Sequence, residues 1–321
     1  MTDKKPEMFS FVIPCYNSTD TLDAVVEEIC TMMQKDLPGY LFEIILVNDG
    51  SPNGTTYDKI CSIAKVNSHV KGINLARNFG QPSAVMAGMN HAKGDYVVCG
   101  DDDGQTPYNE FPRLFEKITQ GYDAVEGKFT QHEKRSLVRV IGTKMNEWMA
   151  TFLINKPKGL VLTTYWVVKR FVAQEMIKYS NSYPYLGGLM MRTTQNVVNV
   201  GFAKKERLTG KSGYNIKKMI ELWLNGFTSF SVKPLRIAVF IGIFSAFGGL
   251  IFGIVTIIRK LLDPTIAAGY SSILAVMLIM FGVMFLLMGM MGEYVGRIYM
   301  ALNNTPQFVI KETIGMDEED E

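Results

Sequence analysis

Cysteine and histidine are scarce in this chain, and neither is clustered. The 321 residues include four cysteines and three histidines, with no C-x-x-C pair and no histidine next to a cysteine. Structural zinc sites and disulfide frameworks need such clusters, so the sequence indicates neither. The four cysteines, which we expect to stay reduced, are Cys15, Cys30, Cys61 and Cys99.

The chain as a whole also lacks an excess of one charge sign. Its 33 basic and 31 acidic side chains leave a formal net charge of +2, which gives no sign of a nucleic-acid partner. Residues 202–236 are an exception, because they carry eight basic and only two acidic side chains. A local positive charge of this kind suits a membrane surface or a phosphate-rich ligand.

A secretory signal is missing from the amino terminus. The first 17 residues lack the succession of charged, apolar and small residues that marks a signal peptide. We therefore expect the leading domain to remain in the cytoplasm, where thiols stay reduced.

Short apolar runs alternate with longer helix-like segments between residues 9 and 199. The runs of strand length are 9–14, 42–48, 70–75 and 96–100. The segments with helical spacing are 21–34, 57–67 and 83–92. This alternation predicts an α/β fold with a mainly parallel, Rossmann-like sheet. Ligands of such folds bind beyond the carboxyl ends of the strands, so we look for chemistry in the residues after each strand.

Two long apolar runs follow in the last third of the chain. Residues 237–258 and 273–291 are uncharged stretches of 22 and 19 residues. A helix of 22 residues is about 33 Å long, enough to cross a hydrocarbon core. Buried core helices are the alternative, but two such runs within residues 237–292 favour a transmembrane hairpin. A hairpin would place the acidic tail, 293–321, on the same cytoplasmic side as the leading domain.

The segment before the hairpin is amphipathic. Between residues 215 and 231, apolar residues including Trp223 and Phe227 fall on one helical face and charged ones fall largely opposite. Such a helix either lies in the membrane interface or packs on the leading domain, and both interpretations remain open. We therefore divide the chain into a leading domain at 1–214, an amphipathic helix at 215–236, the hairpin and the tail.

The strongest chemical signal is an acidic cluster directly after the fourth predicted strand. Asp101, Asp102 and Asp103 repel one another unless a cation neutralises them. Carboxylate oxygens favour Mg²⁺ or Mn²⁺, which can also bridge a diphosphate. A solvated acidic turn is the alternative, although it is less common for three acids that follow an apolar strand.

Weaker motifs follow the other strands. Asp49 is in a turn with Gly50, where its carboxylate could accept hydrogen bonds from a base or a ribose. Arg77 precedes a predicted helix, so that a guanidinium and a helix amino terminus could both face phosphate. Each motif alone is only a turn signal.

Taken in order, these motifs resemble glycosyltransferase family two, whose nucleotide-sugar-binding fold is called GT-A. The chain is most similar to the polyisoprenyl-phosphate glycosyltransferases, a group that includes dolichol-phosphate mannose synthase and bacterial undecaprenyl-phosphate sugar transferases. The resemblance covers residues 8 to 310. It rests on Pro14-x-Tyr16-Asn17, Asp49-Gly50-Ser51, Arg77-Asn78-Phe79-Gly80-Gln81, Ala92-x-Gly94-Asp95, Asp101-x-Asp103-x-Gln105-x-Pro107, Arg207-x-x-Gly210-x-Ser212-x-Tyr214, Pro234-Leu235-Arg236 and Gly292-Glu293-Tyr294-Val295-Gly296-Arg297-Ile298-Tyr299.

The resemblance implies a role for each matching residue. Asp101 and Asp103 would hold the metal and, with Gln105 and Arg207, form the catalytic set. The residues implied in donor-nucleotide binding are Pro14, Tyr16, Asn17, Asn48, Asp49, Asp101 and Asp102. The residues implied or hypothesised to bind the acceptor phosphate are Lys128, Arg139, Arg207, Lys211, Ser212 and Tyr214. For Lys128 and Arg139, a solvated basic face is the competing interpretation.

Several positions depart from the family pattern. Ser18 stands where relatives usually have Glu, Asn48 stands where Asp often precedes Asp49, and residues 159–166 lack the usual acidic and basic residues. The last segment tends to meet the donor sugar, so the identity of the sugar stays open. These departures also motivate a rival interpretation, a weakened relative that acts as a nucleotide-sugar-binding membrane scaffold.

The resemblance thus implies an inverting, metal-assisted transferase, which we expect in the inner membrane. It would move one sugar from a nucleotide diphosphate, with UDP favoured, to undecaprenyl phosphate or a similar lipid for modification of cell-surface glycans. Self-association, for example as a tetramer, is expected from the Gly-rich and Met-rich spans and from the family resemblance. A transferase acting on a sugar hydroxyl is the alternative, but it needs a general base, and residues 160–166 offer no carboxylate.

Overall fold

The computed structural model of the chain describes residues 7–52, 54–130, 151, 156–203, 233–263, 269–303 and 305–316. Two units make up the molecule. The first contains Met1–Ile220 and Asn304–Glu321, and the second contains Glu221–Asn303. The second unit is therefore inserted between two parts of the first. Most of the predicted amphipathic helix, up to residue 232, lies outside the described residues.

Four strands alternate with helices in the first part of the larger unit. In chain order these elements are β1 (Met8–Cys15), α1 (Leu22–Asp36), β2 (Leu41–Asn48), α2 (Thr55–Val66), β3 (Val70–Leu75), α3 (Gln81–Asn90) and β4 (Tyr96–Cys99). The predicted strand ranges agree with these bounds to within one residue, and the helix ranges to within two. The agreement follows from burial: every residue of β1 after Met8 is buried, which gives the sequence a continuous apolar run.

The rest of the larger unit adds shorter elements. They are a 3₁₀ turn η1 (Tyr108–Glu110), α4 (Phe111–Thr119), β5 (Ala124–Thr130), β6 (Trp166–Lys169), α6 (Arg170–Ile177), α7 (Leu186–Thr193), β7 (Val197–Ala203) and β8 (Ile310–Ile314). The eight strands found in the described residues form one sheet in the order β7-β5-β6-β4-β1-β2-β3-β8.

The centre of the sheet is parallel, as the sequence predicts. Strands β3, β2, β1 and β4 pair in parallel, whereas β6 and β8 pair antiparallel with their neighbours. The chain moves from β1 outward to β2 and β3, and then returns to place β4 on the other side of β1. This reversal creates a crevice between the carboxyl ends of β1 and β4, which is where doubly wound sheets bind ligands.

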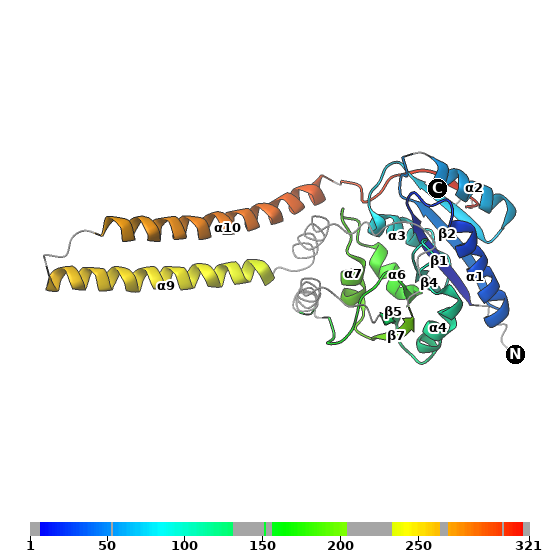
Figure 1. Ribbon diagram of the computed structural model, residues 1–321, viewed down its shortest axis with the longest axis horizontal. Coiled ribbons are helices and arrows are strands. Elements are labelled where there is room, and N and C mark those ends of the chain that lie inside the picture. The colour runs from blue at the N-terminus through cyan, green and yellow to red at the C-terminus, as the bar shows by residue number, and fades with distance from the viewer. Residues whose placement is uncertain are drawn as a thin grey trace. The chain divides into compact units, whose positions relative to one another are not determined.

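Helices cover both faces of the sheet (Figure 1). One face carries α1, α2 and α4, whose apolar side chains join those of β1 and β2 in a single core. An aromatic group anchors this core: the Phe9 ring lies 5.3 Å from Phe111 and 4.8 Å from Phe115, both edge-on. Helix α3 packs against the opposite face, on β1 and β2.

The carboxyl-terminal segment differs from the predicted tail at 293–321. Helix α10 (Tyr270–Leu302) continues eleven residues beyond the predicted end of the span at 291, and strand β8 then adds to the sheet beside β3. No sequence pattern indicated this strand, because its central residues, Lys311, Glu312 and Thr313, are polar.

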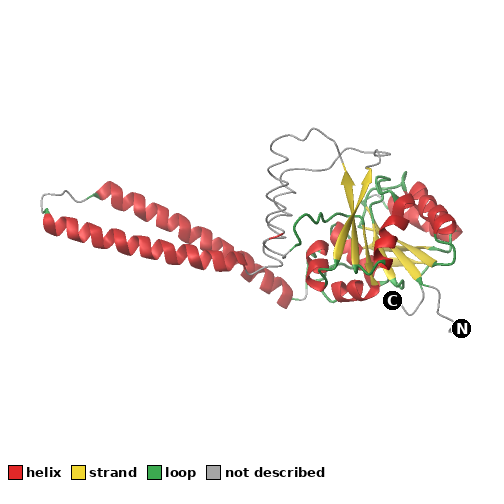
Figure 2. Cartoon of the chain, turned by 90° about the horizontal axis from the view of Figure 1, so that it is seen from below, coloured by secondary structure: helices red, strands yellow, loops and turns green. Residues whose placement is uncertain are grey.

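The second unit holds two long apolar helices, α9 (Lys233–Leu262) and α10, which lie side by side (Figures 1 and 2). Both are long and apolar enough to cross a membrane, over Ala238–Thr256 and Ile279–Met300. Most of their large apolar side chains are exposed, unlike those of a core helix in a soluble domain. The predicted span 273–291 lies within α10 and overlaps the candidate span Ile279–Met300.

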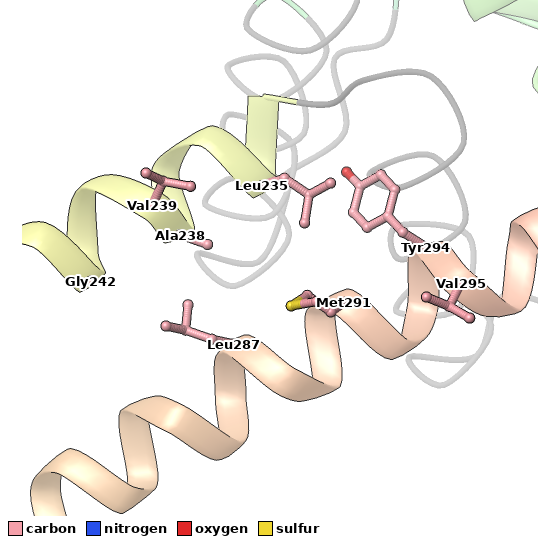
Figure 3. A pocket seen from close by; sticks show the side chains of 8 residues that line it. All are labelled: Leu235, Ala238, Val239, Gly242, Leu287, Met291, Tyr294 and Val295. Atoms are coloured by element: carbon pink, nitrogen blue, oxygen red, sulfur yellow. The ribbon is translucent and has the colours of Figure 1, made fainter.

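An apolar cavity of about 460 Å³ lies between α9 and α10 at one end of the helix pair. Figure 3 shows the residues that line it, four from each helix. They are Leu235, Ala238, Val239, Gly242, Leu287, Met291, Tyr294 and Val295.

Candidate functional site

The crevice between β1 and β4 brings two of the sequence motifs together. The residues after β1 lie against the acidic cluster after β4, because the Ser18 hydroxyl donates a hydrogen bond to Asp102 Oδ2. Tyr16 and Asn17 are exposed in the same turn, whereas Pro14 is buried at the end of β1. Ser18, which departs from the family pattern, thus contacts the proposed site directly.

Asp101 is held by side chains from two other elements. Its Oδ1 accepts from Gln81 Nε2 of α3 at 2.8 Å, and its Oδ2 accepts from Thr164 Oγ1 at 2.6 Å. Its backbone is fixed as well, since Asp101 N donates to Thr106 Oγ1 at 3.0 Å. Two segments distant in sequence therefore orient this carboxylate, and a nearby residue fixes its backbone.

The other two aspartates differ in their surroundings. Asp103 Oδ1 accepts from the backbone N–H of Gln105 at 3.0 Å, which closes a tight turn. Burial raises the pKa of Asp102 to about 6, the neighbouring Asp101 and Asp103 charges add to the rise, and the Ser18 hydrogen bond opposes it. The cluster therefore carries negative charge that a cation would stabilise.

The donor set fits a divalent metal that shares its coordination with a ligand. Among the described residues, no group of three or more His, Cys, Asp or Glu side chains is arranged to hold a metal ion. Mg²⁺ commonly binds through one or two carboxylates plus substrate phosphates. Asp101 and Asp103 are suitable protein ligands for that mode of binding.

The carboxylate of Asp49 is hydrogen-bonded to the backbone of a neighbouring loop. Its Oδ1 accepts from Phe79 N at 2.7 Å and its Oδ2 from Gly80 N at 3.0 Å, and its pKa is raised by burial although these two bonds oppose the rise. The adjacent Gly50 has a φ of +58°, and a Cβ there would lie 2.1 Å from the backbone of Arg77. The two loops thus interlock, which the sequence motifs did not indicate.

Asn48 is likewise bound within the sheet. It is buried, and its amide donates to Asn74 Oδ1 at 2.7 Å while its Oδ1 accepts from Ser51 Oγ at 2.6 Å. Arg77 lies at the surface with its guanidinium 4.7 Å above the Phe79 ring. Residues of both loops line a polar cavity of about 440 Å³, to which Lys311 of β8 also contributes.

The remaining predicted site residues fall into two groups, those that the structure describes and those that lie outside the described residues. Gln105 is half-buried beside the acidic cluster, and Lys128 is exposed on β5. The other predicted residues lie outside the described residues: Arg139, Arg207, Lys211, Ser212 and Tyr214.

The sequence interpretation missed a carboxyl beneath the 159–166 loop. Glu126 of β5 is buried, and its Oε2 accepts from the backbone N–H of Thr163 at 2.8 Å and from Thr163 Oγ1 at 2.9 Å. Its Oε1 has no hydrogen-bond partner among the described residues. Burial raises the pKa of Glu126 to about 8, against the effect of the two Thr163 bonds, so this carboxyl is mainly protonated at neutral pH. The next residue, Thr164, then binds Asp101.

A charged residue in the middle of an apolar strand was the available signal for Glu126. The strand that contains it reads Ala-Val-Glu-Gly-Lys-Phe-Thr. Its partner Thr163 is 37 residues away in sequence, so no local pattern joins the two.

Family comparisons cover both units of the chain. The description "Glycosyl transferase family 2" matches residues 10–180, and "GtrB C-terminal hairpin" matches residues 233–298. A curated relative from Edwardsiella ictaluri, named undecaprenyl-phosphate 4-deoxy-4-formamido-L-arabinose transferase, is 34% identical and covers 100% of this chain and 99% of its own. An uncharacterized glycosyltransferase of Bacillus subtilis, YkcC, is 27% identical over 96% of this chain and 95% of its own.

Solved structures share the fold of the larger unit. Glucosyl-3-phosphoglycerate synthase from Mycobacterium tuberculosis, in complex with Mn²⁺, UDP-glucose and phosphoglyceric acid, gives a TM-score of 0.51 at 16% identity, with coverage of 70% of this chain and 79% of that one. The same enzyme with phosphoglyceric acid gives a TM-score of 0.52 at 15% identity, covering 70% and 80%. With the family match, this likeness confirms the predicted GT-A class of α/β fold.

Proposed function

The chain belongs to glycosyl transferase family 2, and on this premise we propose that it moves a single sugar from a nucleotide diphosphate donor to undecaprenyl phosphate. A UDP-sugar is our favoured donor. The product would serve the modification of cell-surface glycans.

One observation carries this proposal. The undecaprenyl-phosphate transferase from Edwardsiella ictaluri aligns with the whole chain, through both the sheet domain and the hairpin. The geometry of the crevice supports it, because Asp102 contacts the loop after β1 at the position where doubly wound sheets bind nucleotides.

Asp101 and Asp103 would hold Mg²⁺ or Mn²⁺, which would supply positive charge to stabilise the diphosphate leaving group. Gln81 and Thr164 orient Asp101 for this role through the hydrogen bonds described above. Protein groups that are fixed before the reaction stabilise developing charge without reorganising. Gln105, whose backbone closes the turn at Asp103, would contact the sugar or the diphosphate.

A lipid phosphate acceptor needs no general base, because it is already ionised at neutral pH. Its oxygen forms the new bond to the anomeric carbon while the bond from that carbon to the diphosphate breaks, with inversion and release of the nucleoside diphosphate. Glu126, the carboxyl beneath the 159–166 loop, is buried and hydrogen-bonded to Thr163, so it is not placed to take a proton from a hydroxyl acceptor. Positioning of the nucleophile is then the main requirement.

The cationic residues would meet the acceptor phosphate. We assign this role to Lys128, Arg139, Arg207 and Lys211, with Ser212 and Tyr214 of the same motif as Arg207. The apolar helices α9 and α10 would place the enzyme in the inner membrane with the larger unit in the cytoplasm, and we expect a homo-oligomer such as a tetramer.

Mass spectrometry of the lipid fraction tests the proposal. The detergent-purified protein is incubated with undecaprenyl phosphate, Mn²⁺ and a panel of UDP- and GDP-sugars. We expect a mass gain of one sugar from one donor, and loss of this product with EDTA. Binding of UDP without any product would instead favour the scaffold interpretation.

The variant Asp103→Ala tests the assigned site. We expect kcat to fall by about 100-fold or more, as for the loss of a preorganised electrostatic group. Asp58→Ala, which removes an exposed carboxylate on α2, is the matched control and should keep full activity. Equal activity of the two variants would remove Asp103 from the site.

A further inference from the structure

The segment after the second apolar helix is fastened along the larger unit. Gln307 is buried, and its amide donates to the backbone carbonyls of Tyr179 at 3.0 Å and Asn181 at 2.9 Å. The Ala76 N–H then donates to Val309 O at 2.8 Å, and β8 pairs with β3. This segment is therefore part of the larger unit, although the two apolar helices separate it in sequence from the rest of that unit.

A chain of hydrogen bonds runs from this strand to the loop after β1. The Asn17 N–H donates to Ser51 Oγ at 3.0 Å, and the Ser51 hydroxyl donates to Asn48 Oδ1 at 2.6 Å. The Asn48 amide donates to Asn74 Oδ1 at 2.7 Å, and the Asn74 amide donates to Glu312 Oε1 at 2.6 Å. The bonds thus link the loop after β1 to β2, β3 and β8, near the carboxyl ends of β2 and β3.

All of these bonds point in one direction. Each group donates toward Glu312, so the dipoles reinforce one another and the chain ends on a carboxylate, which makes the last bond charge-assisted. At the other end, Asn17 has a φ of +54°, a conformation that costs free energy in a residue other than glycine and needs support from its surroundings. The chain supplies that support through Ser51.

We propose that Glu312 is a positioning residue for the donor site. Through Asn74, Asn48 and Ser51 it holds the exposed turn at Tyr16 and Asn17 in the conformation that receives the nucleotide. The inference rests on the proposed function, since it assigns this turn to the donor. It makes the strand that follows the hairpin a component of the donor pocket.

Substitutions at Glu312 test this in the full chain. Glu312→Ala removes the acceptor, and we expect the Kd for UDP and the KM for the donor to rise about tenfold, with kcat changed less than twofold. Glu312→Gln keeps an oxygen acceptor and should restore both constants to within about threefold. Thr313→Ala is the control, because the neighbouring side chain of a strand points to the opposite face.

The pattern of results separates the possible failures. An unchanged donor KM in Glu312→Ala, with wild-type protein active, would overturn the positioning role alone. A weak Gln variant, together with wild-type UDP binding in Asn74→Ala, would show that the charge of Glu312 acts without the hydrogen-bond chain, and this also contradicts the inference. A wild-type protein that neither binds UDP nor transfers sugar overturns the proposed function, and the inference with it.

A double-mutant cycle adds a readout that loss of stability alone would not give. Asn74→Ala interrupts the same chain one step nearer the turn. If the chain acts as a unit, Glu312→Ala should weaken UDP binding no further in the Asn74→Ala background. Additive losses would contradict transmission through Asn74.

Discussion

Glu126 shows how burial sets the charge state of a residue beside the site. The carboxyl lies beneath the loop that bonds Asp101, and only Oε2 has hydrogen-bond partners among the described residues. Desolvation penalises the charged form, so the pKa rises from 4.5 to about 8 in the folded protein. In the unfolded chain the same group ionises at its ordinary pKa.

This difference makes stability depend on pH. Because the folded pKa is raised, the group's favourable contribution is complete below about pH 4.5 and is lost as pH rises through about 8. Glu126→Gln removes the titration while keeping an acceptor for Thr163. We expect the fall in Tm between pH 5 and pH 8 to become about 5 °C smaller in this variant than in the wild-type protein.

Thermal unfolding followed by circular dichroism at pH 5, 6.5 and 8 measures the effect. Glu116→Gln, an exposed carboxylate on α4, is the control and should keep the wild-type slope. If the Tm of Glu126→Gln falls with pH as steeply as the wild-type Tm, Glu126 is not protonated in the folded state.

Residues of the site could be predicted where a local motif follows a strand, but their partners could not. The position of Asp101 after an apolar strand marked it as a candidate, and the structure brings it to the expected crevice. Asp49 was expected to face a ligand, but its carboxylate also accepts from the backbone amides of Phe79 and Gly80, which are about thirty residues away in sequence. Side-chain pairing at such distances leaves no periodic signal.

At the scale of elements, Gly72 explains how β8 packs at the edge of the sheet. A Cβ at this position would lie 2.5 Å from Ile60 Cγ2 of α2 and 2.8 Å from Ile314 Cγ2 of β8. The absent side chain therefore lets both elements approach β3. Overpacking a close contact of this kind typically costs about 1–3 kcal/mol.

Gly72→Ala should therefore loosen β8, which is an edge strand held by one neighbour. We expect a loss of stability of about 1–3 kcal/mol and faster amide hydrogen exchange in Ile310–Ile314 and in α2. Hydrogen exchange with mass spectrometry measures both. Thr313→Ala, which adds no atom near Gly72, should leave the exchange of α2 unchanged. Wild-type exchange in β8 of Gly72→Ala would contradict this account of the packing.

The strands were predictable from the sequence where helices bury both faces of the sheet. The runs that form β1 to β4 are mainly apolar, because helices cover both faces of the sheet. Strand β8 is polar and lies at the edge, and its bond from Asn74 to Glu312 spans 238 residues. Neither composition nor spacing could place it, so the sequence indicated a tail.

At the scale of the whole molecule, chain connectivity constrains the topology. The larger unit contains residues from before and after the two apolar helices, and its sheet pairs β3 with β8. The two ends of the helix pair must therefore emerge on the same side of any membrane that it crosses. The two apolar runs already predicted a hairpin with both ends on one side, and the pairing of β8 with β3 adds an independent reason that the sequence did not offer.

Cysteine labelling tests the resulting topology. Asp263→Cys places a thiol just after α9, and Thr305→Cys places one after α10, both at exposed positions. With a membrane-impermeant maleimide, Thr305→Cys should react in inverted vesicles, where the cytoplasmic face is outward, and Asp263→Cys should react only in right-side-out spheroplasts. The wild-type protein supplies the background, since Cys15 and Cys99 are buried and Cys30 and Cys61 are half-buried. If both introduced thiols react from the same side, α9 and α10 do not cross the membrane as a hairpin, and the predicted inner-membrane arrangement is wrong.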